Sequence, residues 1–131
     1  LARSVLEGVA YGLRMVQDAV RENGLHYDRM RIGGSGARSD LWAAIVASAL
    51  EVPIERTRTP DAALVGTSML GFTALGTHAD LGDAADAMVA VGECFHPADD
   101  LVDTYRRGYD FFQSLLESMG DLYRQHAETF G

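Results

Sequence analysis

Apolar side chains recur at helical spacing near the start of the chain, at Leu6, Val9, Ala10, Leu13, Val16 and Val20. Charged residues fall mostly between them, as expected of a helix with one apolar face. Asn23 and Gly24 follow, and both tolerate the left-handed backbone that commonly closes a helix. The pattern therefore predicts a helix that ends just before Asn23.

The spacing of apolar residues changes in the next segment. Residues 30–32 form a short apolar run that leads into Gly33-Gly34-Ser35-Gly36. This order predicts a strand followed by a glycine-rich turn. Helical spacing resumes over 41–49, and Ser39 or Asp40 stands where an N-cap belongs. The segment is therefore predicted to run strand, turn, helix.

Residues 52–57 alternate enough to predict a second strand. Pro53 restricts it to a strand start or a sheet edge, because proline cannot donate to a ladder. Arg56 and Arg58 would then lie on or just after an edge strand, where charged side chains discourage pairing with another chain.

Helices dominate the remaining sequence. Thr59-Pro60-Asp61 predicts a helix start, with a capping hydroxyl, a proline at the first helical position and an acid at the positive end of the helix dipole. That helix is expected to reach Gly76, and a short alanine-rich helix is predicted at 84–91. After Pro97 one long helix carries apolar residues at alternating steps of four and three. The tail 123–131 lacks this periodicity and is expected to fray.

Two strands are too few to form a sheet-based domain alone. The predicted fold class is therefore α/β, helix-rich with few strands. Either residues outside the chain complete the sheet, or the chain is a mostly helical subdomain. The chain begins with Leu1 rather than methionine, and we interpret it as a piece of a longer protein.

Composition narrows the choice of function. The chain has 131 residues, of which 47% are hydrophobic and 23% charged, which suits one folded domain and excludes a disordered chain. No apolar run is long enough to cross a membrane. The net charge of −8 argues against binding nucleic acid, but backbone amides could still bind one small anion. The single cysteine, Cys94, fits a reducing, cytoplasmic compartment.

The glycine-rich turn is the strongest candidate for chemistry. A strand, then small residues, then a helix N-terminus lets a backbone approach a phosphate closely. The turn lacks the Lys-Ser/Thr pair of a Walker A loop and the last glycine of a dinucleotide fingerprint. By local pattern alone, a purely structural turn explains it equally well. Arg38, the cation beside the turn, either reaches a phosphate or complements acidic side chains.

A family resemblance changes this balance. Residues 34–42, Gly-Ser-Gly-Ala-Arg-Ser-Asp-Leu-Trp, resemble the Gly-Gly-Gly-Ala-Arg-Ser-x-x-Trp adenosine motif in the C-terminal domain of FGGY-family carbohydrate kinases. That family includes xylulose, glycerol and ribulose kinases. Residues 1–13 resemble the end of its second signature, 60–71 resemble the helix after the adenosine motif, and 95–109 resemble its ending. The matches occur in family order along nearly the whole chain.

The resemblance implies an actin-like, ribonuclease-H-like ATPase fold. Residues 1–131 would form its nucleotide-binding C-terminal domain, incomplete because the N-terminal sugar-binding and catalytic domain is absent. By this resemblance Gly36 and Ala37 meet the phosphates and adenosine of the nucleotide through their backbone. Asp40 would face the adenine or ribose, and Gly34 and Ser35 would complete the turn. ATP is the implied cofactor, and Mg²⁺ is implied by the resemblance only.

The parent protein would transfer the γ-phosphoryl group of ATP to a sugar or polyol hydroxyl. In this family the general base lies in the N-terminal domain, so no catalytic residue is assigned here, and the chain alone is expected to be inactive. Its four histidines are scattered without cysteine partners, so no metal site is predicted. No nucleic-acid or membrane partner is expected, and a homodimer stays open. The competing hypotheses are a non-catalytic helical interaction module and a degenerate relative that binds nucleotide without catalysis.

Overall fold

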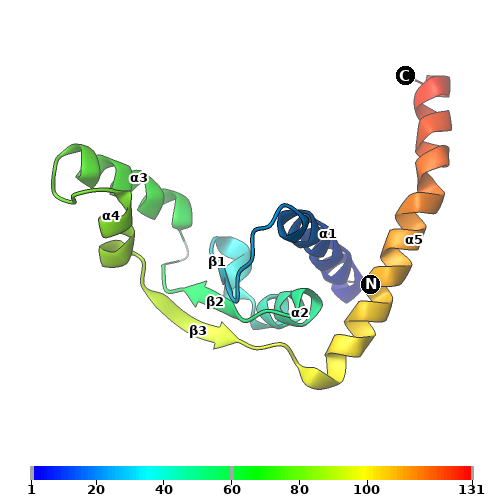
Figure 1. The fold of residues 1–131 in the computed structure, drawn as a ribbon, viewed down its shortest axis with the longest axis horizontal. Helices are drawn as coiled ribbons and strands as arrows, with labels where there is room; N and C mark the ends of the chain where they lie inside the picture. The colour runs from blue at the N-terminus through cyan, green and yellow to red at the C-terminus, as the bar shows by residue number, and fades with distance from the viewer. Residues whose placement is uncertain (1, 60, 131) are drawn as a thin grey trace.

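The computed structural model describes residues 2–59 and 61–130. Its elements, in chain order, are α1 (Ala2–Glu22), β1 (Met30–Ile32), the 3₁₀ turn η1 (Ser35–Arg38), α2 (Asp40–Leu50), β2 (Ile54–Thr57), α3 (Ala62–Ala74), α4 (Leu81–Met88), β3 (Val91–Phe95) and α5 (Asp99–Phe130). Figure 1 shows α1, α2 and α5 gathered on one side of a small sheet, with α3 and α4 standing apart on the other side. The structure is therefore helix-rich, as the sequence predicts.

The sheet has three strands in the order β1-β2-β3. β1 pairs parallel with β2, and β2 pairs antiparallel with β3, with a register irregularity between Glu55 and Thr57. This corrects two predictions. β3 was not expected, because its exposed middle, Gly92 to Cys94, carries no apolar alternation. β2 is the central strand rather than an edge, and Pro53 stands just before its first residue.

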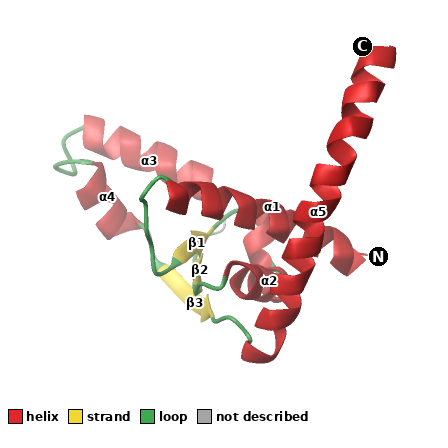
Figure 2. Ribbon diagram, turned by 45° about the vertical axis from the view of Figure 1, so that its right-hand side comes forward, coloured by secondary structure: helices red, strands yellow, loops and turns green. Residues whose placement is uncertain are grey.

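The core forms around α2. Ile45 and Leu50 on α2 and Ile54 on β2 are among the largest fully buried side chains, and Ala10 of α1 and Tyr105 of α5 complete the cluster. Small alanines on α2 allow its neighbours to approach closely, because they add little volume between the backbones. Figure 2 shows α2 enclosed between the strands and the lower part of α5. The core therefore lies directly behind the turn that precedes α2.

Polar contacts join α1, α2 and α5 at the end of α2. Glu51 adopts a left-handed conformation there, with φ of 57°. Its carboxylate accepts from Arg14 of α1 at 2.9 Å and from the Nε of Arg106 of α5 at 2.9 Å. Hydrogen bonding from Arg106, followed by the charge of Arg14, lowers the pKa of Glu51. This one carboxylate thus joins three helices.

Glycine allows α5 to cross α1 closely. A Cβ placed on Gly108 would collide with the hydroxyl of Tyr11. The Tyr11 ring also lies 6.3 Å from the ring of Tyr105 and 5.7 Å from the ring of Phe112, measured between centroids. The absence of a side chain at Gly108 therefore makes room for the Tyr11 ring between the two helices.

Three element boundaries differ from their predictions. α3 is capped by Asp61, whose Oδ1 accepts from the Leu64 amide at 3.1 Å, rather than by the Thr59 hydroxyl; Pro60 lies outside the described residues. α4 begins at Leu81, because the Asp80 side chain caps it by accepting from the Asp83 amide at 2.9 Å. α5 extends as a helix to Phe130, beyond the predicted apolar periodicity, and residues 121–130 contain neither proline nor glycine.

Candidate functional site

The carboxyl ends of the two parallel strands meet at one edge of the sheet. η1 follows β1 at this edge, and the start of α3 follows β2. Between them lies an open groove of about 570 Å³, lined by Gly33, Gly34, Ser35, Arg38, Asp61, Ala62 and Ala63. Ligands of open α/β sheets bind in the crevice outside the carboxyl ends of strands. The groove has that location, so it is the candidate site.

Two glycines shape this groove. Gly34 has φ of +83°, which glycine adopts without the steric cost that a Cβ imposes. At Gly33 a Cβ would lie 3.2 Å from the Cβ of Ala62 and 3.4 Å from the hydroxyl oxygen of Thr57. Glycine at position 33 therefore lets the start of α3 approach the end of β1.

The amides of the turn are only partly used. The Ala37 amide donates to the Gly34 carbonyl and the Ser39 amide to the Gly36 carbonyl, both at 3.2 Å. The amides of Gly34, Ser35 and Gly36 donate to no acceptor among residues 2–59 and 61–130. Backbone amides without a hydrogen-bond partner at the start of a helical turn can donate to a bound anion. The turn thus keeps three successive donors for a ligand or water.

The predicted site residues do not all lie together. Gly34 and Ser35 line the groove. Gly36 lies outside its lining, where a Cβ would stand 3.6 Å from the Trp42 ring nitrogen. Ala37 is 2% exposed, and Asp40 projects outward and pairs with the Arg56 guanidinium. The structure therefore brings Gly34 and Ser35 to the groove, and separates the side chains of Ala37 and Asp40 from it.

Sequence reasoning missed the second wall of the groove. Asp61, Ala62 and Ala63 were interpreted only as a helix start. The signal that could have located them is the position of each segment directly after a strand, because parallel strands end at the same edge. That inference requires knowing that β1 and β2 are parallel neighbours, which spacing alone does not establish.

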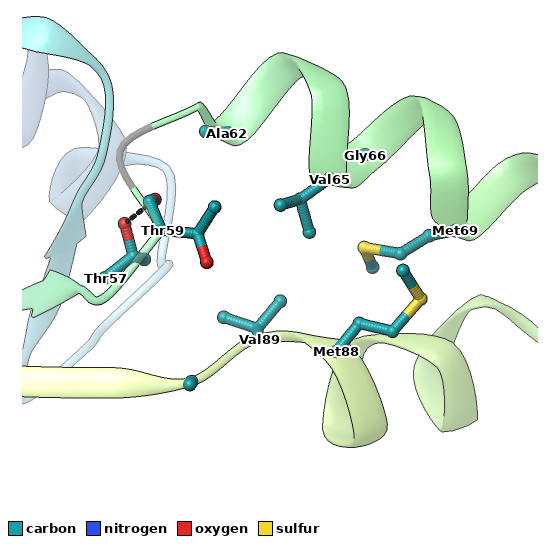
Figure 3. Close-up of a pocket in the computed structure, with 9 residues that line it drawn as sticks. Thr57, Thr59, Ala62, Val65, Gly66, Met69, Met88 and Val89 are labelled. Atoms are coloured by element: carbon teal, nitrogen blue, oxygen red, sulfur yellow. Dashed lines mark hydrogen bonds between the residues drawn. The ribbon is translucent and has the colours of Figure 1, made fainter.

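A second hollow lies between α3 and α4. It holds about 110 Å³ and is lined mainly by apolar groups, with no charged side chain. Figure 3 shows Val65 and Met69 on α3 facing Met88 and Val89, with Thr57 and Thr59 at one end. The Thr57 hydroxyl donates to the Thr59 carbonyl at 3.0 Å, so it is already engaged. This hollow offers packing space rather than reactive groups.

Within the described part of the chain, no three His, Cys, Asp or Glu side chains gather where they could hold a metal ion. None of the described helices is both long and apolar enough to span a bilayer.

Several carbohydrate kinases resemble this chain in sequence and in fold. Xylulose kinase of Staphylococcus epidermidis is 26% identical over 121 residues, which are 92% of this chain and 24% of that protein. The crystal structure of xylulose kinase from Rhodospirillum rubrum matches with a TM-score of 0.77 at 28% identity, covering 93% of this chain and 25% of that chain. Ligand-bound xylulose kinase from Lactobacillus acidophilus matches with a TM-score of 0.84 at 19% identity, covering 95% and 25%.

The fold is that of part of an actin-like, ribonuclease-H-like ATPase domain. The pattern described as "FGGY family of carbohydrate kinases, C-terminal domain" matches residues 1–75, more than half of the chain. The chain belongs to this family. It spans about a quarter of the length of the relatives that it matches.

Proposed function

We propose that the chain is the nucleotide-binding C-terminal portion of an ATP-dependent sugar or polyol kinase. The observation that supports this most directly is the set of unspent amides at Gly34, Ser35 and Gly36, next to a groove at the carboxyl edge of the sheet. Membership of a carbohydrate kinase family supports the same assignment. The chemistry that these residues offer is binding of a phosphate-bearing ligand.

Each wall of the groove would have a distinct role. The amides of Ser35 and Gly36 would donate to phosphate oxygens, and Arg38 supplies a positive charge at the same wall. The Asp61 carboxylate on the opposite wall is held by the Leu64 amide. Because Asp61 repels phosphate, we place the phosphates against the glycine wall. We keep Gly36, Ala37 and Asp40 as the contacts to adenosine that the family resemblance implies.

Catalysis requires more than this chain. When bound, ATP supplies the γ-phosphoryl group that the parent kinase transfers to a hydroxyl of its substrate. Phosphoryl transfer depends on positioning both substrates and on electrostatic stabilisation. The amides here can hold only the nucleotide, and no ligand for Mg²⁺ is assigned in this chain. We therefore propose that the isolated chain binds nucleotide without kinase activity.

A backbone-directed variant tests the groove. Ser35→Pro deletes one of the free amide hydrogens, at the first position of a helical turn where proline is tolerated. We expect it to weaken ATP binding by about tenfold, the effect of one hydrogen bond to a charged group. Ser35→Ala keeps the amide and should bind as the original chain does. Fluorescence of Trp42, the single tryptophan, reports binding because its ring lies next to Gly36.

The result separates the proposed function from its alternatives. Saturable ATP binding that Ser35→Pro weakens and Ser35→Ala preserves supports the nucleotide site. A flat titration, or equal affinity for both variants, contradicts it. Sugar-dependent ATP turnover by the 131-residue chain alone would overturn the proposed inactivity of this portion.

A further inference from the structure

Three arginines converge on one pocket beside the glycine turn. The pocket holds about 220 Å³ and is lined by Ala37, Arg38, Arg56, Thr57 and Arg58. We call it the arginine pocket. Arg38 borders both this pocket and the groove. The whole chain has a net charge of −8, so this local concentration of positive charge contrasts with the rest of the chain.

The distribution of ion pairs makes this concentration unusual. Most arginines pair with a carboxylate, namely Arg3, Arg14, Arg29, Arg31, Arg56, Arg106 and Arg124. Arg38 and Arg58 form no ion pair with any described residue, although acids outnumber basic residues by 19 to 11. Arg21 and Arg107 also have no ion pair among the described residues, but of these four arginines only Arg38 and Arg58 line the same pocket. Arg38 therefore does not complement an acid; the acids next to the pocket, Asp40 and Glu93, pair with Arg56 instead.

Arg56 is fixed between these two cations. Its Nη2 pairs with Asp40 and, at 3.3 Å, with Glu93. Its guanidinium carbon lies 4.7 Å from the centroid of the Phe95 ring. Its Nε is buried and has no hydrogen-bond partner among the described residues. The side chain is thus held in place by its neighbours, and because its Nε is buried, Arg56 contributes a fixed positive charge to the pocket rather than that hydrogen bond.

The balance of charge identifies the ligand class. Asp40 and Glu93 face Arg56 and offset its charge, which leaves the charges of Arg38 and Arg58 without partners. Two adjacent guanidinium groups repel each other, and an anion placed between them relieves this repulsion. A phosphate carries about −1.5 to −2 charge at neutral pH, and guanidinium donates to it in a bidentate manner. We propose that Arg38, Arg56 and Arg58 form a binding site for a phosphate group.

This site shares Arg38 with the proposed nucleotide groove, but its other two arginines do not line the groove. The groove depends on backbone amides of the turn, whereas the arginine pocket depends on side chains from η1 and from the end of β2. The phosphate group could be free inorganic phosphate or part of a bound nucleotide. The two sources share the same chemistry, and competition between them distinguishes them.

Calorimetric titration with inorganic phosphate, at constant ionic strength set by chloride, tests the proposal. We expect saturable binding with one phosphate per chain. Arg38→Gln and Arg58→Gln should each weaken it by about tenfold or more, because each removes a charge-assisted hydrogen bond. The matched control is Arg107→Gln, since Arg107 is an exposed arginine of α5 that has no ion pair among the described residues. Circular dichroism confirms that each variant is folded.

Two results would overturn the proposal. One is the absence of saturable phosphate binding by the original chain. The other is an equal loss for Arg107→Gln and Arg58→Gln, which would reduce the effect to overall charge. In a second arm, ATP is added to the phosphate-bound chain. Displacement of phosphate assigns the pocket to the nucleotide's own phosphates, and simultaneous binding assigns it to free phosphate; both uphold an arginine-based site. Ser35→Pro should leave phosphate affinity unchanged, so failure of the groove would not be mistaken for failure of this pocket.

Discussion

α2 and α3 are similarly apolar but lie in opposite environments. Both are apolar on nearly every side, and α3 has no charged residue between Ala62 and Ala74. Most of α2 is buried, including Ile45, Val46 and Leu50, whereas no residue of α3 is. Leu64 and Leu70 on α3 are 64% and 60% exposed. A helix that is apolar all round normally lies inside a protein, and only α2 does so within this chain.

The difference lies in what each helix has to pack against. α1, β2 and α5 enclose α2, whereas α3 packs chiefly against α4. The chain exposes 8792 Å² of surface, compared with about 6,800 Å² for a compact protein of its mass. The excess is about 2,000 Å², more than twice the roughly 800 Å² that each partner buries in a standard protein interface. The apolar composition of a helix therefore predicts that the helix is buried, but it does not specify which part of the protein buries it.

The largest expected effect is a truncation inside α2. Leu50→Ala removes a side chain that is 1% exposed, and should lower the free energy of unfolding by about 2–5 kcal/mol. Urea denaturation followed by circular dichroism measures this change. A loss below about 1 kcal/mol would mean that α2 is not the centre of the core.

The packing of α5 against α1 should depend on pH. Burial, followed by the hydrogen bond to Asp18 at 2.6 Å, raises the pKa of Tyr109 to about 12. Because the folded chain holds this proton more tightly than the unfolded chain, whose tyrosines titrate near pH 10, the stabilisation is complete below pH 10. It is lost as the pH rises from about 10 to 12.

Tyr109→Phe should therefore show a shallower fall in unfolding free energy between pH 10 and 12. Tyr123→Phe is the matched control, because Tyr123 lies on the exposed part of α5. Stability measured by denaturation at several pH values compares the two variants. Parallel curves for Tyr109→Phe and the original chain would contradict the role of this hydroxyl.

Capping provides a smaller contrast between the two helices. Ser39 caps α2 by accepting from the Trp42 amide at 3.2 Å, and Asp61 caps α3 in the same way. Ser39→Ala should lower the free energy of global unfolding by about 1 kcal/mol, since α2 is the core helix. Asp61→Ala should instead reduce helix content without shifting the main unfolding transition. Equal shifts of that transition would show that α3 unfolds together with the core.

The smallest expected effect is a truncation on α3. Leu70→Ala matches Leu50→Ala in chemistry, but its side chain is exposed, so the free energy of unfolding should change by less than about 0.5 kcal/mol. The same denaturation measurement applies. A loss comparable to that of Leu50→Ala would mean that another surface, such as a second copy of the chain, covers α3.

Much of the fold was predictable because local rules dominate it. Periodicity located α1, α2 and the first part of α5, and the helix-start pattern at 59–61 located α3; of the two predicted caps of α2, Ser39 is the one that forms. β3 escaped prediction because a short strand with exposed central residues carries no clear alternation. The parallel pairing of β1 with β2 also escaped, since strand order depends on contacts distant in the sequence.

Only the glycine wall of the candidate site was predictable from the sequence. Small residues in a turn after a strand pointed to Gly34 and Ser35, which line the groove. The opposite wall at Asp61 to Ala63 and the cluster of Arg38 with Arg56 and Arg58 come from segments about twenty residues apart. Their convergence follows from strand pairing, which no local pattern encodes.

By itself, the sequence determined the helices, the conformation of the glycine turn and the family, because spacing, caps and backbone freedom are local properties of residue types. Only the tertiary structure decided which apolar helix is buried and which charges meet. Burial and electrostatic pairing depend on distances between segments, and strand pairing at the sheet sets those distances. For this reason two equally apolar helices differ in exposure, and two arginines without acidic partners share one pocket.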